Sequence, residues 1–150
     1  MKKFRFSLET VLDYKNQALD ALRAEHGAIL AQVRAQEKVI EDLEADSLVG
    51  DADFARRKLE GINVLDAMSC EQYLRSLERK LQEEYRRLER LRKREEEKRS
   101  QVVEARKETA TIEKLKEHKL EDYRKAEQKD EEQRIEEFVS TTRAMAALGM

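Results

Sequence analysis

Apolar residues recur at alternating spacings of three and four along the first third of the chain. Eight of the eleven positions in this series are apolar, and most residues between them are charged or polar. A repeat of this period is typical of a helix that supercoils against a partner helix. The positions are Leu8, Leu12, Lys15, Leu19, Leu22, His26, Ile29, Val33, Gln36, Ile40 and Leu43.

A second series with the same spacing follows later in the chain, and eight of its twelve positions are apolar if alanine is counted. Its polar positions cluster in the middle, and the pattern thins past Leu115. The positions are Leu74, Leu77, Leu81, Glu84, Leu88, Leu91, Glu95, Lys98, Val102, Ala105, Thr109 and Ile112. The two series predict two long helices that bury these positions against each other.

The chain is predicted to reverse between the two series. Gly61 can adopt the left-handed conformation that ends a helix. Asn63 is a good N-cap, and Asp66 follows three residues later, as in a capping box. Residues 47–54, "SLVGDADF", are a weaker alternative for the turn. An antiparallel pair that turns at 61–63 brings together residues whose numbers add up to about 123.

The predicted fold is therefore all-α, a single antiparallel coiled-coil hairpin over residues 1–150. Helix 1 is expected at about 7–59, the turn at about 60–63 and helix 2 at about 64–147. Helix 2 is the longer, so its last part should extend beyond helix 1 without a partner. The register places Lys15 near Glu108.

The same register places Glu25 near Lys98.

At the start of the chain, Ser7 is a candidate N-cap for helix 1, and Phe6 could pack on Val11 as a hydrophobic staple. This arrangement leaves Phe4 without a role.

Composition agrees with long helices rather than a globular core. Charged residues make up 43% of the chain, aromatic residues 5%, and proline is absent. The net charge of −2 favours neither nucleic acid nor a membrane surface as a partner. No apolar run reaches the roughly 18 residues of a membrane span, and "MKKFRFSLETVL" does not resemble a signal peptide. The expected location is the cytoplasm, and Cys70 alone cannot form an intrachain disulfide.

The residue pattern offers little for catalysis. The four glycines are too far apart to form a phosphate-binding loop. His26 and His118 are also far apart, whereas a metal site needs clustered ligands. We therefore expect neither an enzyme nor a bound metal or cofactor, and we interpret His26 as a polar position within the helix interface.

Two runs of charge remain. Residues 86–94, "RRLERLRKR", are basic, and residues 127–137, "EQKDEEQRIEE", are acidic. The basic run could be a patch for nucleic acid or another anionic partner, but interleaved glutamates favour a solvated helix face. Nucleic acid is therefore not an expected partner.

Three blocks in order resemble the FliJ family of the bacterial flagellar type III export apparatus. They are "FRFSLETVL" at the start, "GINVLDAMSCEQYLRSLE" at the turn, and "IEKLKEHKLEDYRKAEQKDEEQRIEEFV" near the end. The resemblance implies a non-catalytic, two-helix stalk that binds the hexameric export ATPase. It also implies contact with the cytoplasmic domain of the export gate and escort of export chaperones. Such a protein is expected to be a monomer when free, and to reach the membrane only peripherally, through the export apparatus.

The resemblance also implies where these partners bind. The end that carries both termini would face the ATPase, through Phe4, Phe6, Leu115, Leu120, Tyr123 and Phe138. The gate contact would lie nearer the turn, at Leu43, Tyr73 and Leu77. Asp46 and Gly50 stand near positions where the family often has aromatic residues, so the helix 1 half of that contact departs from the family pattern.

Two other functions are compatible with the pattern. One is the equivalent stalk of a virulence type III secretion system. The other is a structural coiled-coil spacer, which would usually continue as a parallel dimer rather than turn back on itself.

Overall fold

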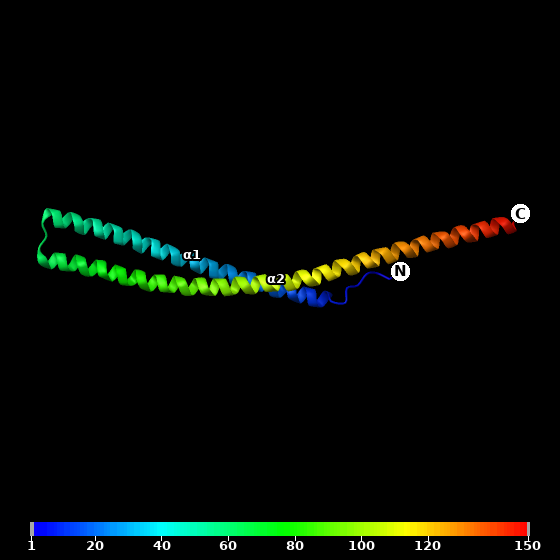
Figure 1. The fold of residues 1–150 in the computed structure, drawn as a ribbon, viewed down its shortest axis with the longest axis horizontal. Coiled ribbons are helices and arrows are strands. Elements are labelled where there is room, and N and C mark those ends of the chain that lie inside the picture. The colour runs from blue at the N-terminus through cyan, green and yellow to red at the C-terminus, as the bar shows by residue number, and fades with distance from the viewer. Residues whose placement is uncertain (1, 150) are drawn as a thin grey trace. The chain divides into compact units, whose positions relative to one another are not determined.

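The computed structural model describes residues 2–149, and its two helices form an antiparallel hairpin. Helix α1 spans Glu9–Glu60 and helix α2 spans Val64–Leu148 (Figure 1). The predicted fold class, a helical hairpin with the longer helix second, is confirmed. The chain falls into two compact units, which are described separately below: Asp20–Val103, and Met1–Leu19 together with Glu104–Met150.

The turn lies at residues 61–63. Gly61 has a φ of 98°, a left-handed backbone conformation that side chains with a Cβ rarely adopt. Asn63 caps α2, since its Oδ1 accepts a hydrogen bond of 2.8 Å from the Asp66 N–H. Residues 47–54, the alternative position for the turn, are helical and belong to α1. The chain therefore reverses where a glycine and a capping residue occur together.

The predicted cap of α1 is wrong. The Glu9 N–H donates to the Phe6 carbonyl at 3.1 Å, and the first α-helical bond runs from Leu12 to Leu8. The helix begins at Glu9, so Leu8 and not Ser7 directly precedes it. A backbone turn satisfies the Glu9 N–H, in place of the Ser7 hydroxyl.

In the unit Asp20–Val103, α1 and α2 run side by side on either side of the turn (Figure 1). The core is a thin stripe of aliphatic side chains rather than a globular interior. Ile29, Val33, Ile40 and Leu88 are its buried members, and Leu81 and Leu91 pack against them. All of these were predicted interface positions, and the predicted polar positions of this unit are likewise buried or half-buried.

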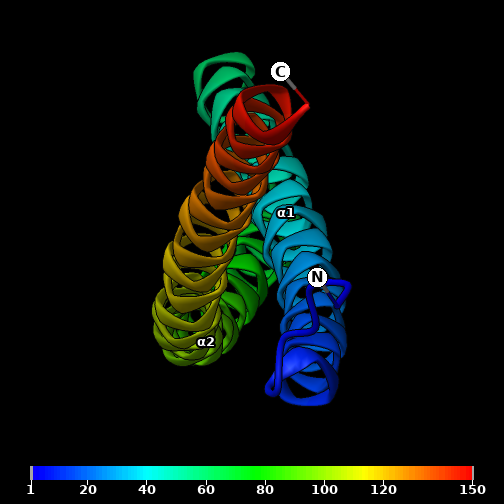
Figure 2. The same ribbon diagram turned by 90° about the vertical axis from the view of Figure 1, so that its right-hand side faces the viewer.

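In the other unit, the first part of α1 packs against residues 104–123 of α2. Figure 2 views this unit nearly end-on. Leu12, Leu19 and Thr109 are buried. Beyond Tyr123, α2 continues to Leu148, and apart from the half-buried Asp130 every residue in this tail is exposed. We call residues 124–148 the C-terminal tail.

Candidate interaction surfaces

The N-terminal segment is held to α2 by an aromatic contact. The rings of Phe4 and Tyr123 are 5.6 Å apart between centroids and tilted by 53°. This geometry is favourable for aromatic pairs. The Tyr123 hydroxyl also donates a hydrogen bond to the Lys2 carbonyl. Phe4, which the sequence pattern left without a role, therefore fixes the segment that precedes α1.

A pocket lies next to this contact and is lined by Phe4, Arg5, Phe6, Glu9 and Lys116. Lys116 Nζ is 2.8 Å from a Glu9 carboxylate oxygen, so one wall of the pocket is an ion pair between the two helices. Neither residue of this pair belongs to the two predicted interface series. Lys116 could have been found by extending the second series by one step of four, from Ile112.

The other residues implied for the terminal end differ in exposure. Phe6 and Leu120 are half-buried, and Leu115 is exposed at the edge of the packed part. Phe138 lies in the C-terminal tail and is 71% exposed. It shares one helix face with Ile135 and Val139, which are also exposed. The structure thus brings Phe4 and Tyr123 together, while Phe138 belongs to a separate apolar stripe with no helix against it.

The three residues implied for the gate contact are not equivalent. Leu77 is only 5% exposed, and Leu43 is half-buried, so both pack in the helix interface. Tyr73 is 53% exposed, and its ring lies against Gly50. A Cβ built on Gly50 would be 3.4 Å from Tyr73 Cε1 and 2.9 Å from Leu74 Cδ2. The missing side chain at Gly50 therefore leaves room for the Tyr73 ring beside α1, while about half of the tyrosine stays in solvent.

Exposed aliphatic side chains that no predicted interface position includes gather beside the turn. Leu59, Val64, Leu65 and Met68 are all more than half exposed. They stand outside the 3,4 repeat, so the interface pattern does not include them. Their signal in the sequence is the run of aliphatic residues on both sides of a predicted turn.

Two polar pairs interrupt the aliphatic interface of the unit Asp20–Val103. His26 Nε2 is 2.9 Å from Glu95 Oε1. Gln36, which is 5% exposed, donates from its amide nitrogen to the Glu84 backbone carbonyl at 3.0 Å and also to the Glu84 carboxylate. Every buried side-chain polar atom in the described part of the chain has a hydrogen-bond partner.

Predicted ion pairs across the two helices are present in both units. Lys15 Nζ lies 2.8 Å from Glu108 Oε2, and Lys98 Nζ lies 2.7 Å from Glu25 Oε2. These distances confirm the predicted register. Exposed pairs of this kind contribute about 0–1 kcal/mol each, so they select the register more than they stabilise it.

Three titratable groups have pKa values shifted by hydrogen bonds. The Glu44 carboxylate accepts from the Tyr85 hydroxyl and raises the pKa of that tyrosine. The Arg56 guanidinium lowers the pKa of Asp53, and Asp42 raises the pKa of Lys38. All three groups are at the surface, where such shifts accompany ordinary ion pairs and hydrogen bonds.

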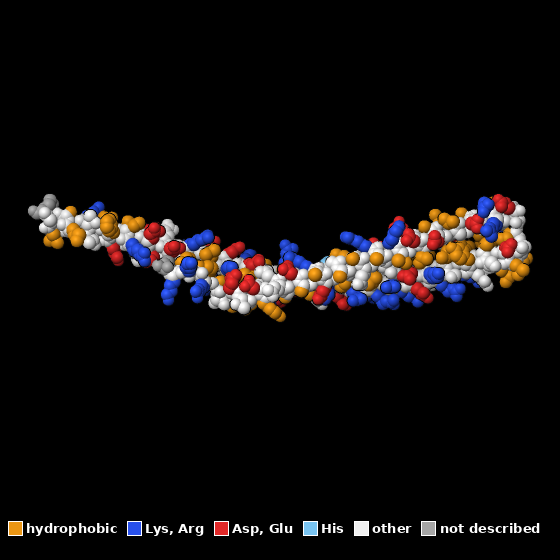
Figure 3. Space-filling model, turned by 180° about the vertical axis from the view of Figure 1, so that it is seen from behind, with side chains coloured by type: hydrophobic (Ala, Val, Ile, Leu, Met, Phe, Trp, Pro, Cys, Tyr) orange, Lys and Arg blue, Asp and Glu red, His pale blue; other side chains and the backbone are white. Residues whose placement is uncertain are grey.

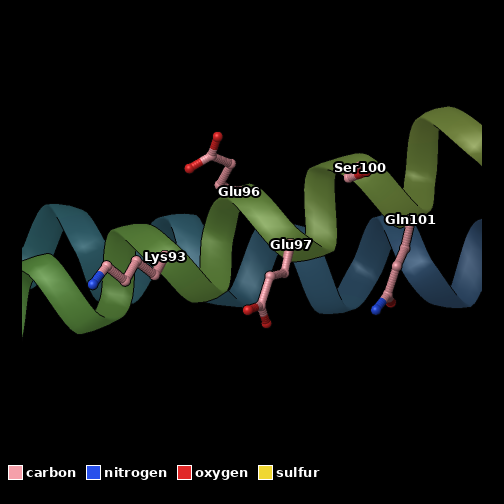
Figure 4. A pocket seen from close by; sticks show the side chains of 5 residues that line it. All are labelled: Lys93, Glu96, Glu97, Ser100 and Gln101. Carbon is pink, nitrogen blue, oxygen red and sulfur yellow. The ribbon is translucent and has the colours of Figure 1, made fainter.

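A second concave surface, open to solvent, is lined by Lys93, Glu96, Glu97, Ser100 and Gln101, all on α2 and all exposed. Figure 4 shows that Glu96 points away from Glu97 and Gln101, so the side chains do not converge on one point. Within residues 2–149, no three His, Cys, Asp or Glu side chains cluster as metal ligands would. Cys70 is half-buried, with Arg57 Nη1 4.0 Å from its sulfur.

None of the helices in the described residues is long and apolar enough to cross a membrane. The fold and its surfaces define a class of protein: a helical hairpin that presents apolar and charged contact surfaces. The chain belongs to the FliJ family, because the family model described as "Flagellar FliJ protein" matches residues 4–146. It is thus a component of the flagellar export apparatus, in a family of non-catalytic proteins. Comparisons with curated proteins and with solved structures give no match.

Proposed function

We propose that this protein is a non-catalytic stalk of flagellar type III export, which binds the hexameric export ATPase through the unit that carries both termini. It contacts the cytoplasmic domain of the export gate near the turn, and it escorts export chaperones. It works in the cytoplasm as a monomer when free, and reaches the inner membrane peripherally through the export apparatus.

The observation that carries this proposal is the C-terminal tail. Residues 124–148 form a helix whose apolar side chains, Ile135, Phe138 and Val139, have no helix packed against them. An isolated helix of this kind is marginal in water, so a binding partner would stabilise it. The adjoining contact between Phe4 and Tyr123 gives the tail a rigid base.

The proposed gate contact rests on a different observation, the outer face of Tyr73. Gly50 supports the ring on one side, and 53% of the residue is accessible. A preorganised aromatic side chain of this kind is a common anchor in protein interfaces. The exposed aliphatic residues beside the turn could extend the same contact.

The ATPase contact is tested with the cognate export ATPase and two truncated chains. Removal of residues 117–150 should abolish co-purification with the ATPase and stimulation of ATP hydrolysis. The sharper variant ends at Tyr123, because it keeps the aromatic contact and removes only the unpartnered tail. Full stimulation by this shorter chain would contradict the proposed role of the tail.

The gate contact is tested in parallel with Tyr73→Ala. This variant should lose binding to the gate's cytoplasmic domain and keep its stimulation of the ATPase. The chain ending at Tyr123 should behave in the opposite way. Loss of both activities in Tyr73→Ala, with unchanged helix content, would show that the two contacts are not separate.

A further inference from the structure

A row of five unpaired charges follows one face of α2. Glu83, Arg86, Arg90, Arg94 and Glu97 are spaced by three, four, four and three residues, and all five are exposed. Residues three and four apart share a helix face, so the five form one stripe. We call this row the charge stripe.

The stripe points away from α1. Arg86 and Arg90 stand two residues before and after Leu88, which is buried in the helix interface. At about 100° per residue, they lie on the opposite side of α2. Figure 3 shows Lys and Arg side chains gathered along the outer edge of α2 in this region.

Several basic residues near the stripe have ion-pair partners, whereas its three arginines, like Arg87 beside them, have none among the described residues. Arg92 pairs with Glu37, Lys93 with Glu89 and Arg99 with Glu95. Within residues 2–149, no member of the charge stripe forms an ion pair. Because helix surfaces readily form such pairs at these spacings, an unpaired row of three arginines leaves its hydrogen-bonding capacity open to another molecule.

We propose that the charge stripe is a docking site for a helix of a partner protein, with acidic residues facing the three arginines and a basic residue at each end. The stripe reads negative, positive, positive, positive, negative. A helix that carries the complementary order at the same spacing can pair with all five charges. The stripe is symmetric about Arg90, so the partner helix can lie parallel or antiparallel.

The order of the charges favours a protein helix over nucleic acid or an anionic membrane. A uniform polyanion would pair with the arginines but meet Glu83 and Glu97 at the ends. Nucleic-acid binding at physiological salt relies on many phosphate contacts along the bound face, and on this face a glutamate stands at each end of the three arginines. Membrane binding by a helix face needs apolar side chains beside the basic ones, and the stripe positions themselves are all charged. Arginine also matches a carboxylate with two parallel hydrogen bonds.

The test uses the full chain and a synthetic helical peptide with Lys, Glu, Glu, Glu and Lys at the complementary positions. Binding is followed by NMR titration at low salt, which detects weak complexes and locates them. Amide shifts should concentrate on residues 83–97. A second peptide with the same composition, but with Glu and Lys alternating, should bind about threefold more weakly or worse.

The decisive variant is Arg86→Glu/Arg90→Glu/Arg94→Glu, which should weaken binding of the first peptide at least about tenfold. A peptide with Lys at all five positions faces five glutamates in this variant, and should bind it and restore the affinity. The matched control is Arg106→Glu/Lys114→Glu/Lys119→Glu, three exposed basic residues on the same helix, and should bind the first peptide like the original chain. Circular dichroism verifies that both triple variants keep their helix content.

Three outcomes would overturn the proposal. The first is equal affinity for the two peptides. The second is unchanged binding in the stripe variant. The third is a nucleic-acid duplex or an anionic phosphatidylglycerol vesicle that binds at residues 83–97 more tightly than the patterned peptide under the same conditions. This proposal does not depend on the ATPase or gate contacts, so their failure would leave it standing.

Discussion

His26 on α1 and Glu95 on α2 form a pair inside the helix interface, with His26 Nε2 2.9 Å from Glu95 Oε1. The two side chains are 19% and 16% exposed. They interrupt a stripe that is otherwise mostly aliphatic. Polar residues at such positions set the register of a coiled coil at some cost in stability, because other registers would leave them without partners.

The first prediction concerns this pair. His26→Leu leaves the Glu95 carboxylate facing an apolar side chain, and should lower the free energy of unfolding by about 1–3 kcal/mol. Arg99 Nε lies 3.8 Å from the same carboxylate and still offers it a partner, so the loss of stability should fall near the lower end of this range. His26→Leu/Glu95→Leu should be at least as stable as the original chain, because an apolar pair replaces a desolvated polar one. Urea unfolding followed by circular dichroism measures both, and equal losses in the two variants would contradict the prediction.

A second prediction compares two glycines within α1. No atom lies within 4 Å of a Cβ built on Gly27, so Gly27→Ala should stabilise the helix by about 0.5–1 kcal/mol. A Cβ on Gly50 would lie 2.9 Å from Leu74 Cδ2, so Gly50→Ala must displace that side chain. The gain in stability from Gly50→Ala should therefore be smaller than that from Gly27→Ala, or become a loss. Thermal unfolding of the two variants side by side decides this, and equal gains would show that the Gly50 contact carries no constraint.

The turn provides a third prediction. Gly61 has a φ of 98°, so Gly61→Ala should cost about 1–3 kcal/mol through backbone strain. No atom lies within 4 Å of the added Cβ, so the loss would not come from a clash. A D-alanine at the same position, introduced by chemical ligation, should recover the stability. Urea midpoints measure both changes, and an unchanged midpoint for the L-alanine variant would be inconsistent with the observed backbone.

The fourth prediction is a pH dependence. The Glu44 carboxylate accepts a hydrogen bond from Tyr85 and raises the pKa of its hydroxyl above the usual value of 10.0. Because the folded chain favours the protonated phenol, this bond contributes stability below the pKa of the unfolded chain. The contribution is lost as the pH rises through the raised pKa. Ultraviolet titration of tyrosinate should show one tyrosine moving to lower pH in Glu44→Ala, and Tyr85→Phe identifies that tyrosine as the one lost.

The sequence by itself determined where the two helices lie and which positions of one helix face the other. The 3,4 spacing assigns interface positions such as Leu12, Ile40 and Leu88, because a helix places residues of that period on one face. Gly61 and Asn63 mark the turn, since few residue types suit those backbone positions. Once the turn was placed, the pairing of Lys15 with Glu108 followed from counting alone. Such features depend on residues close together in the chain, so they can be predicted from the sequence.

Tertiary structure decided which of the apolar and aromatic residues are buried and which are accessible. Tyr73 and Leu77 stand one turn apart, yet Leu77 lies in the interface and Tyr73 shows its outer face because Gly50 makes room for the ring. The contact between Phe4 and Tyr123 likewise depends on the path of a non-helical segment, which has no periodicity. Exposure depends on what lies across from a side chain in space, and the repeat along the chain specifies only which face that side chain occupies.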